Sequence, residues 1–159
     1  MRLVRRLALP IFVVLLFAPL AGAQTKFMAT LSGKEQNPPI DTPAHGMATF
    51  TLSDDGMSLS YTLSVVDTTD ITMAHIHIAA EGQDGPVATW LYPSAPHAQV
   101  KPGSFTGDLA TGTLTAADLV GPLQGKTIAD LVADIKAGNA YVNVHTSAHP
   151  GGEIRGQIQ

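Results

Sequence analysis

The 159-residue sequence contains no cysteine, and charged residues make up only 14% of it. The absence of cysteine excludes disulfides, thiolate metal ligands, a cysteine nucleophile and a lipid-modified N-terminal cysteine. A metal site in this chain must therefore use histidine, methionine, carboxylate or amide groups. Basic residues are also scarce. After the first 23 residues, six scattered Lys and Arg side chains stand against thirteen acidic ones, a net charge of −7, so no nucleic-acid partner is expected.

The sequence has one long apolar run, which lies at its N-terminus. Arg2, Arg5 and Arg6 precede the run Leu7–Leu20, and the small residues Ala21-Gly22-Ala23 follow it. This order is typical of a cleavable export signal, which we place at residues 1–23. The run is shorter than the roughly 20 apolar residues that span a bilayer. We therefore expect an exported protein, periplasmic or secreted, without a membrane span after cleavage, and a single domain over residues 24–159.

Beyond the signal, alternating apolar and polar residues predict short antiparallel strands separated by turns. Turn residues such as Asp54-Asp55-Gly56 separate the runs. The predicted strands cover Gly46–Leu52, Ser58–Val65, Met73–Ile78, Pro86–Tyr92, Phe105–Leu114, Ala140–Thr146 and Glu153–Ile158. Many short strands joined by turns indicate a mainly β fold, which we predict to be an antiparallel Greek-key β-sandwich.

One short helix is predicted in the C-terminal half, over Thr127–Ala137. Its apolar residues have helical spacing and would lie on the core: Ile128, Leu131, Val132 and Ile135. Thr127 and Asp130 have the spacing of a capping box, and Gly138 suits the left-handed helix end. The helix is expected to cover one end of the sandwich.

Three histidines share one face of the predicted strands. Because side chains alternate along a strand, His75 and His77 point together, away from Ile76, with backbones roughly 6–7 Å apart. The same alternation places His145 opposite Val144, and we expect all three imidazoles on the outer side of the sheet. They converge only if the two strands are adjacent. Three histidines suit copper or zinc.

The pattern also suggests further ligands and supporting residues for this metal. Met73 lies on the same face and would add a thioether, which favours copper over zinc because Cu(I) prefers soft ligands. Met73 or His45 is therefore the expected fourth ligand, and Asn143 and Glu153 are expected to orient the ring nitrogens. Since imidazole must be neutral to bind a metal, affinity is expected to fall as the pH drops through roughly 6.5.

Five segments together resemble the CHRD domain, a family named after repeats in chordin. They are residues 31–39 (LSGKEQNPP), 74–77 (AHIH), 84–87 (DGPV), 141–146 (YVNVHT) and 150–158 (PGGEIRGQI). The resemblance runs from Phe27 to the C-terminus and implies an extracytoplasmic, β-rich domain. In chordin the domain belongs to a protein-binding antagonist, so the resemblance also implies interaction with another extracytoplasmic protein.

A fainter resemblance links the sequence to the copper–zinc superoxide dismutases. It lies in the order of an opening Ala29–Gly33 strand, the His75/His77 pair and the late His145. The zinc loop, cysteines and steering arginine of that family have no counterpart, so the resemblance implies a sandwich with one metal, and strands 73–78 and 140–146 side by side, but not dismutase activity. Three functions therefore stay open: binding of a single metal ion without turnover, protein interaction with incidental histidines, and metal-dependent redox catalysis.

Overall fold

The computed structural model describes residues 24–94 and 97–159. The predicted export signal, residues 1–23, lies outside the described residues. The strands are β1 (Lys26–Ser32), β2 (His45–Leu52), β3 (Leu59–Ile78), β4 (Val87–Tyr92), β5 (Lys101–Leu114), β6 (Ala140–Thr146) and β7 (Ile154–Gln157), with one α-helix, α1 (Ile128–Lys136). Three short 3-10 turns cover Gly33–Glu35, Ala116–Asp118 and Gly121–Leu123. No helix in the described part of the chain is long and apolar enough to cross a membrane.

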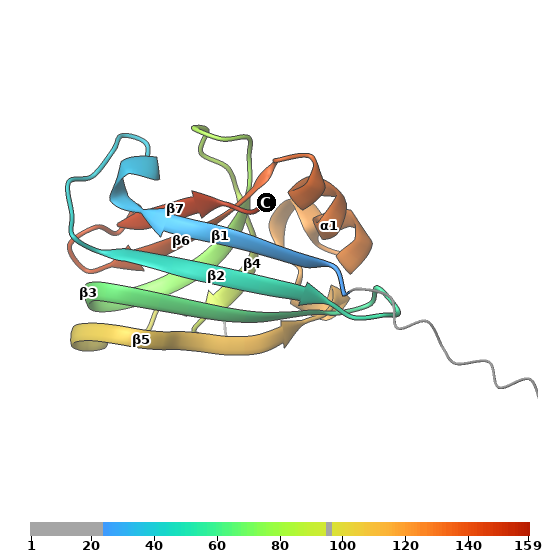
Figure 1. The fold of residues 1–159 in the computed structure, drawn as a ribbon, viewed down its shortest axis with the longest axis horizontal. Coiled ribbons are helices and arrows are strands. Elements are labelled where there is room, and N and C mark those ends of the chain that lie inside the picture. The colour runs from blue at the N-terminus through green and yellow to red at the C-terminus, as the bar shows by residue number, and fades with distance from the viewer. Residues whose placement is uncertain (1–23, 95–96) are drawn as a thin grey trace, which may run out of the picture.

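The mainly β prediction is confirmed, but the strands form a closed barrel rather than a two-sheet Greek-key sandwich. The ring runs β1–β2–β3–β6–β7 and returns to β1, with β4 and β5 as additional partners of β3 (Figure 1). The ring closes because β3 is long. Its first half pairs with β2, from Leu59 to Val66, and its second half pairs with β6, from Ile71 to Ile78.

β3 covers two strands that the sequence predicts separately, over 58–65 and 73–78. The chain between them stays extended, and the pairing with β5 shifts register there. Asp67 and Asp70 adopt positive φ in this stretch, a conformation that Asp tolerates better than most residues. These irregularities interrupt the alternation, which explains why the sequence indicates a break where the strand continues.

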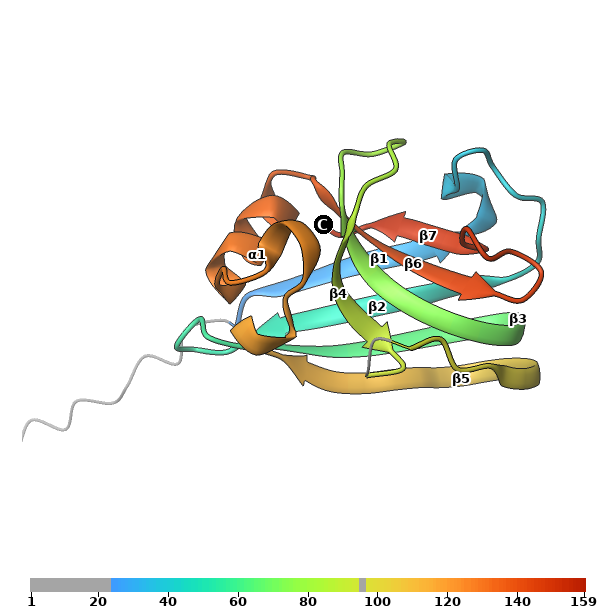
Figure 2. The ribbon, with the colours of Figure 1, turned by 180° about the vertical axis from the view of Figure 1, so that it is seen from behind.

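Side chains from all five barrel strands fill one core, which α1 covers at one end (Figure 2). Fully buried apolar residues come from each strand of the ring, including Leu31, Phe50, Leu63, Ile76, Val142 and Ile154. The predicted helix is confirmed. The side chain of Thr127 accepts a hydrogen bond from the Asp130 N–H, and the Asp130 carboxylate accepts one from the Thr127 N–H.

The closure between β7 and β1 leaves no room for a side chain at Gly156. A Cβ at this position would collide with the backbone carbonyl of Thr30 on β1. We expect Gly156→Ala to lower the free energy of unfolding by about 1–3 kcal/mol, as overpacking does in tight interiors. Urea denaturation measures this. Gly151→Ala is the matched control, since a Cβ there meets nothing within 4 Å, and equal urea midpoints for the two variants would contradict the prediction.

Candidate metal centre

The three histidines come from two adjacent strands of the barrel. His75 and His77 lie on β3 and His145 lies on β6, and the two strands pair antiparallel with Met73 opposite His145 and His75 opposite Asn143. The ring centroid of His75 lies 5.5 Å from that of His77 and 5.1 Å from that of His145. The ring centroids of His77 and His145 are 6.1 Å apart. The structure therefore brings together the three histidines that the sequence singles out.

The cluster lies on the face of the strands opposite the core residues Ile76 and Val144, as expected, but it is buried there rather than exposed. The exposed fractions of His75, His77 and His145 are 3%, 8% and 6%. Trp90 of β4 packs edge-to-face against His75, with ring centroids 4.2 Å apart. The loops that contain Gly85 and Pro150 contact His77 and His145, respectively. The alternation of strand residues shows which side chains share a face, but not what covers that face.

Two backbone carbonyls fix the protonation of the rings. The Nδ1 atom of His77 lies 2.9 Å from the Gly85 carbonyl oxygen, and the Nδ1 atom of His145 lies 3.0 Å from that of Pro150. A carbonyl oxygen only accepts, so each Nδ1 carries the proton and donates it. The lone pair of each neutral ring is then on Nε2, the nitrogen that can bind a metal. In His145 this Nε2 accepts a hydrogen bond from His75 Nδ1.

The remaining ring nitrogens have the spacing of ligands to one ion. His75 Nδ1 and His145 Nε2 are hydrogen-bonded at 3.2 Å. An ion held by both would replace this hydrogen bond at nearly the same spacing, because two nitrogens bound tetrahedrally at ~2.0–2.1 Å are about 3.3 Å apart. One ligand atom from each of the three residues lies within 4.8 Å of the others. The Nε2 atom of His77, which carries the lone pair of that ring, is buried without a hydrogen-bond partner among the described residues, and a bound cation would satisfy this lone pair. The donor set therefore fits a transition metal.

Burial keeps these imidazoles neutral. Desolvation, with the neighbouring His145 and His77, lowers the pKa of His75 to about 3, and desolvation lowers the pKa of His145 to about 4. Desolvation also lowers the pKa of His77, despite its bond to the Gly85 carbonyl, which acts in the opposite direction. Protons therefore compete with a metal at lower pH than the ordinary histidine value of about 6.5 suggests.

The two candidate fourth ligands lie in different places. Met73 is half-buried, lies opposite His145 and precedes His75 by two residues, so its side chain is on the face that carries the cluster. His45 is exposed at the start of β2, pairs with Ser32 and Val66, and is not part of the cluster. The structure thus keeps Met73 as a candidate ligand and separates His45 from the site.

Asn143 and Glu153 are buried beside the cluster but bond to other groups. The Asn143 side chain accepts a hydrogen bond from Gln36 Nε2 at 2.7 Å and donates one to the Gly151 carbonyl. Glu153 accepts a hydrogen bond from Thr42 Oγ1 at 2.7 Å. The ring nitrogens are oriented instead by backbone carbonyls in turns, where the sequence carries no side-chain signal beyond the turn residues themselves.

A stack of three side chains, which the sequence analysis missed, supports His77. The Tyr141 ring lies parallel to the His77 ring, with centroids 4.9 Å apart and an interplanar angle of 9°. The Arg155 guanidinium also packs on the Tyr141 ring, 3.8 Å from its centroid. Tyr141, Asn143 and His145 alternate along β6, so the shared face of these residues is the signal in the sequence for the tyrosine.

The chain is similar to a known domain family and to a curated protein. The CHRD domain family model matches residues 27–158. Chordin of Xenopus laevis is 32% identical over 150 residues, which cover 91% of this chain and 14% of chordin, so the chain spans a small part of that relative. No solved structure matches. Because the family model covers nearly the whole described chain, the chain belongs to the CHRD domain family.

Proposed function

We propose that this protein binds a single transition-metal ion through His75, His77 and His145. The observation that carries the proposal is the arrangement of the ring nitrogens. Two Nδ1–H groups are held by backbone carbonyls, which directs the His77 and His145 lone pairs away from those carbonyls. If the three histidines had only a structural role, their buried ring nitrogens would be expected to be hydrogen-bonded. Here two of them lack a partner within the described part of the chain.

Copper is the metal that we propose, with zinc as the alternative. Neutral imidazole binds both ions well, and three histidines suit either. Met73 supports copper, because its side chain shares the face of the cluster and a thioether is a soft ligand that selects Cu(I). The expected N-terminal export signal and the CHRD family membership support an extracytoplasmic location, periplasmic or secreted.

Metal titration followed by tryptophan fluorescence tests the proposal. Trp90 is the sole tryptophan and packs against His75, so Cu(II) in the site should quench most of its emission and saturate at one equivalent. Zn(II), which is diamagnetic and redox-inert, should bind in the same ratio with little quenching. His45→Ala, which changes an exposed histidine outside the cluster, should titrate like the wild type. If the wild-type protein binds neither Cu(II) nor Zn(II) stoichiometrically, the proposal is contradicted.

Protein interaction is a second candidate function, favoured by the similarity to chordin. In that case the histidines would be a structural cluster and the protein would act by binding another extracytoplasmic protein. The same titration separates the candidates. A wild-type protein that binds neither Cu(II) nor Zn(II) stoichiometrically would leave the interaction module as the better interpretation.

A further inference from the structure

The loop Ala79–Pro86 joins β3 to β4 and contacts the metal-site residue His77. Gly85 provides two of these contacts: its carbonyl accepts from His77 Nδ1, and its N–H donates to the Tyr141 hydroxyl at 3.2 Å. At the base of the loop, the Ile78 N–H bonds to the Pro86 carbonyl at 3.0 Å. The position of Gly85 therefore decides which nitrogen of His77 carries its proton.

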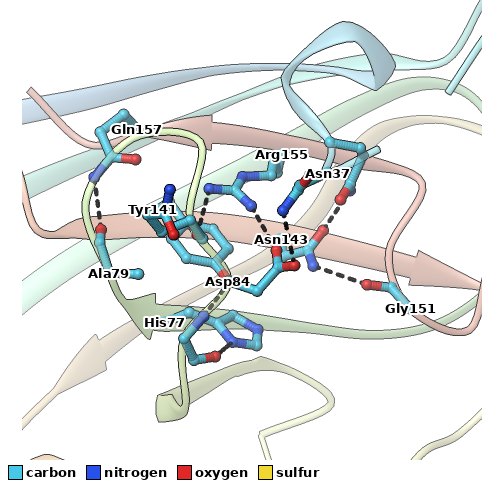
Figure 3. Close-up of polar contacts among 12 residues, drawn as sticks. Asn37, His77, Ala79, Asp84, Tyr141, Asn143, Gly151, Arg155 and Gln157 are labelled. Carbon is cyan, nitrogen blue, oxygen red and sulfur yellow. Dashed lines mark hydrogen bonds and ion pairs between the residues drawn. The ribbon is translucent and has the colours of Figure 1, made fainter. Parts of the chain in front are cut away.

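Arg155 of β7 holds this loop from the other side (Figure 3). Its Nη2 donates to the Gln83 carbonyl at 2.9 Å, and its Nη1 pairs with the Asp84 carboxylate at 3.0 Å. The guanidinium also covers Tyr141, whose ring stacks on His77. One side chain thus contacts both structures that fix His77, namely the loop that accepts its proton and the ring that sets its plane.

The burial of Arg155 needs an explanation beyond stability. Its side chain is 2% exposed, whereas its ion-pair partner Asp84 is 64% exposed. Burying a charge has a large desolvation cost, which a partner in solvent offsets poorly, so buried ion pairs are weak evidence for stabilisation. The planar, five-donor guanidinium is suited to holding a carbonyl, a carboxylate and an aromatic face at once.

We propose that Arg155 is a positioning residue for the metal site. By fixing the loop Ala79–Pro86 and the Tyr141 ring, it holds His77 with the proton on Nδ1 and the Nε2 lone pair available to the ion, and so sets how tightly the ion is bound. This inference rests on the proposed metal-binding function. Outer hydrogen bonds of this kind typically change the affinity of a metal site by about 10–100-fold when they are lost.

Two variants test the inference without removing a ligand. Arg155→Lys keeps the positive charge but loses the fork and the flat stack. Tyr141→Phe keeps the ring but removes the hydroxyl that Gly85 contacts. Glu81→Gln is the matched control, because Glu81 is an exposed acidic residue of the same loop. Copper affinity is measured by competition with a chelator, and the protonation of the His77 ring is read from its ¹⁵N NMR shifts in the metal-free protein.

We expect Arg155→Lys to weaken copper binding by about tenfold or more, with a smaller loss in Tyr141→Phe and no change in Glu81→Gln. In Arg155→Lys and Tyr141→Phe the His77 ¹⁵N shifts should move toward a mixture of the two neutral tautomers, a change that loss of stability alone would not cause. If Arg155→Lys does not fold, Tyr141→Phe decides the matter through the same two measurements.

The outcomes separate this inference from the function on which it rests. Wild-type affinity together with an unchanged His77 tautomer in the folded variants would overturn the role of Arg155 and leave metal binding standing. Absence of copper and zinc binding by the wild type would overturn both. Weaker binding with a shifted tautomer, in variants whose circular dichroism matches the wild type, would support both.

Discussion

Replacing His145 with alanine should abolish stoichiometric copper binding. His145 comes from β6, whereas His75 and His77 come from β3, so in the proposed site it would be the ligand that joins the two strands through the ion. Without it, two imidazoles remain, and affinity should fall by more than about 100-fold, the upper end of what loss of an outer hydrogen bond costs a metal site. The Trp90 emission of this variant should stay unquenched at one equivalent of Cu(II).

His149→Ala is the matched control for this experiment. His149 lies four residues further along, in the turn before β7, and is not part of the cluster. Circular dichroism of both metal-free variants should show the wild-type β spectrum. If a folded His145→Ala protein binds one equivalent of Cu(II) at wild-type affinity, the ion binds somewhere other than the three-histidine cluster.

The parts of the site that depend on strand periodicity could be predicted from the sequence. Alternation alone places His75 and His77 on one face, opposite Ile76, and His145 opposite Val144. The adjacency of the two strands is a long-range property that no local pattern carries, and only the resemblance to the dismutases implies it. The structure pairs the strands with Met73 opposite His145.

The barrel and the burial of the cluster could not be predicted in the same way. Closure depends on the length of β3, which pairs first with β2 and then with β6, and on the contact of β7 with β1, where Ser32 pairs with Arg155. Neither has a periodic signature. The groups that orient the rings, the carbonyls of Gly85 and Pro150, are backbone atoms that every residue has. Local patterns therefore identify the clustered histidines better than the groups that surround them.

The metal-free protein should lose stability steeply below pH 6.5. In the unfolded chain the histidines protonate near their ordinary pKa of about 6.5, whereas burial lowers the pKa of His75 to about 3 and of His145 to about 4 in the folded protein. Between these values the unfolded state binds more protons, so stability falls as the pH falls. Each imidazole contributes up to about 1.4 kcal/mol per pH unit, a large effect for a domain stabilised by about 5–15 kcal/mol.

Urea denaturation at pH 7.5 and at pH 5 measures this loss. His75→Leu removes one titrating ring and should reduce the difference between the two pH values, whereas His45→Ala changes an exposed ring and should leave it unchanged. Bound copper should oppose the loss, because a ligand that binds only the folded state adds about 4 kcal/mol at 1,000 times its Kd. Since the folded imidazoles are still neutral at pH 5, copper should bind there with little loss of affinity. Equal urea midpoints for the metal-free wild type at the two pH values would mean that the cluster is hydrated in solution, and the expected retention of copper at pH 5 would lose its physical basis.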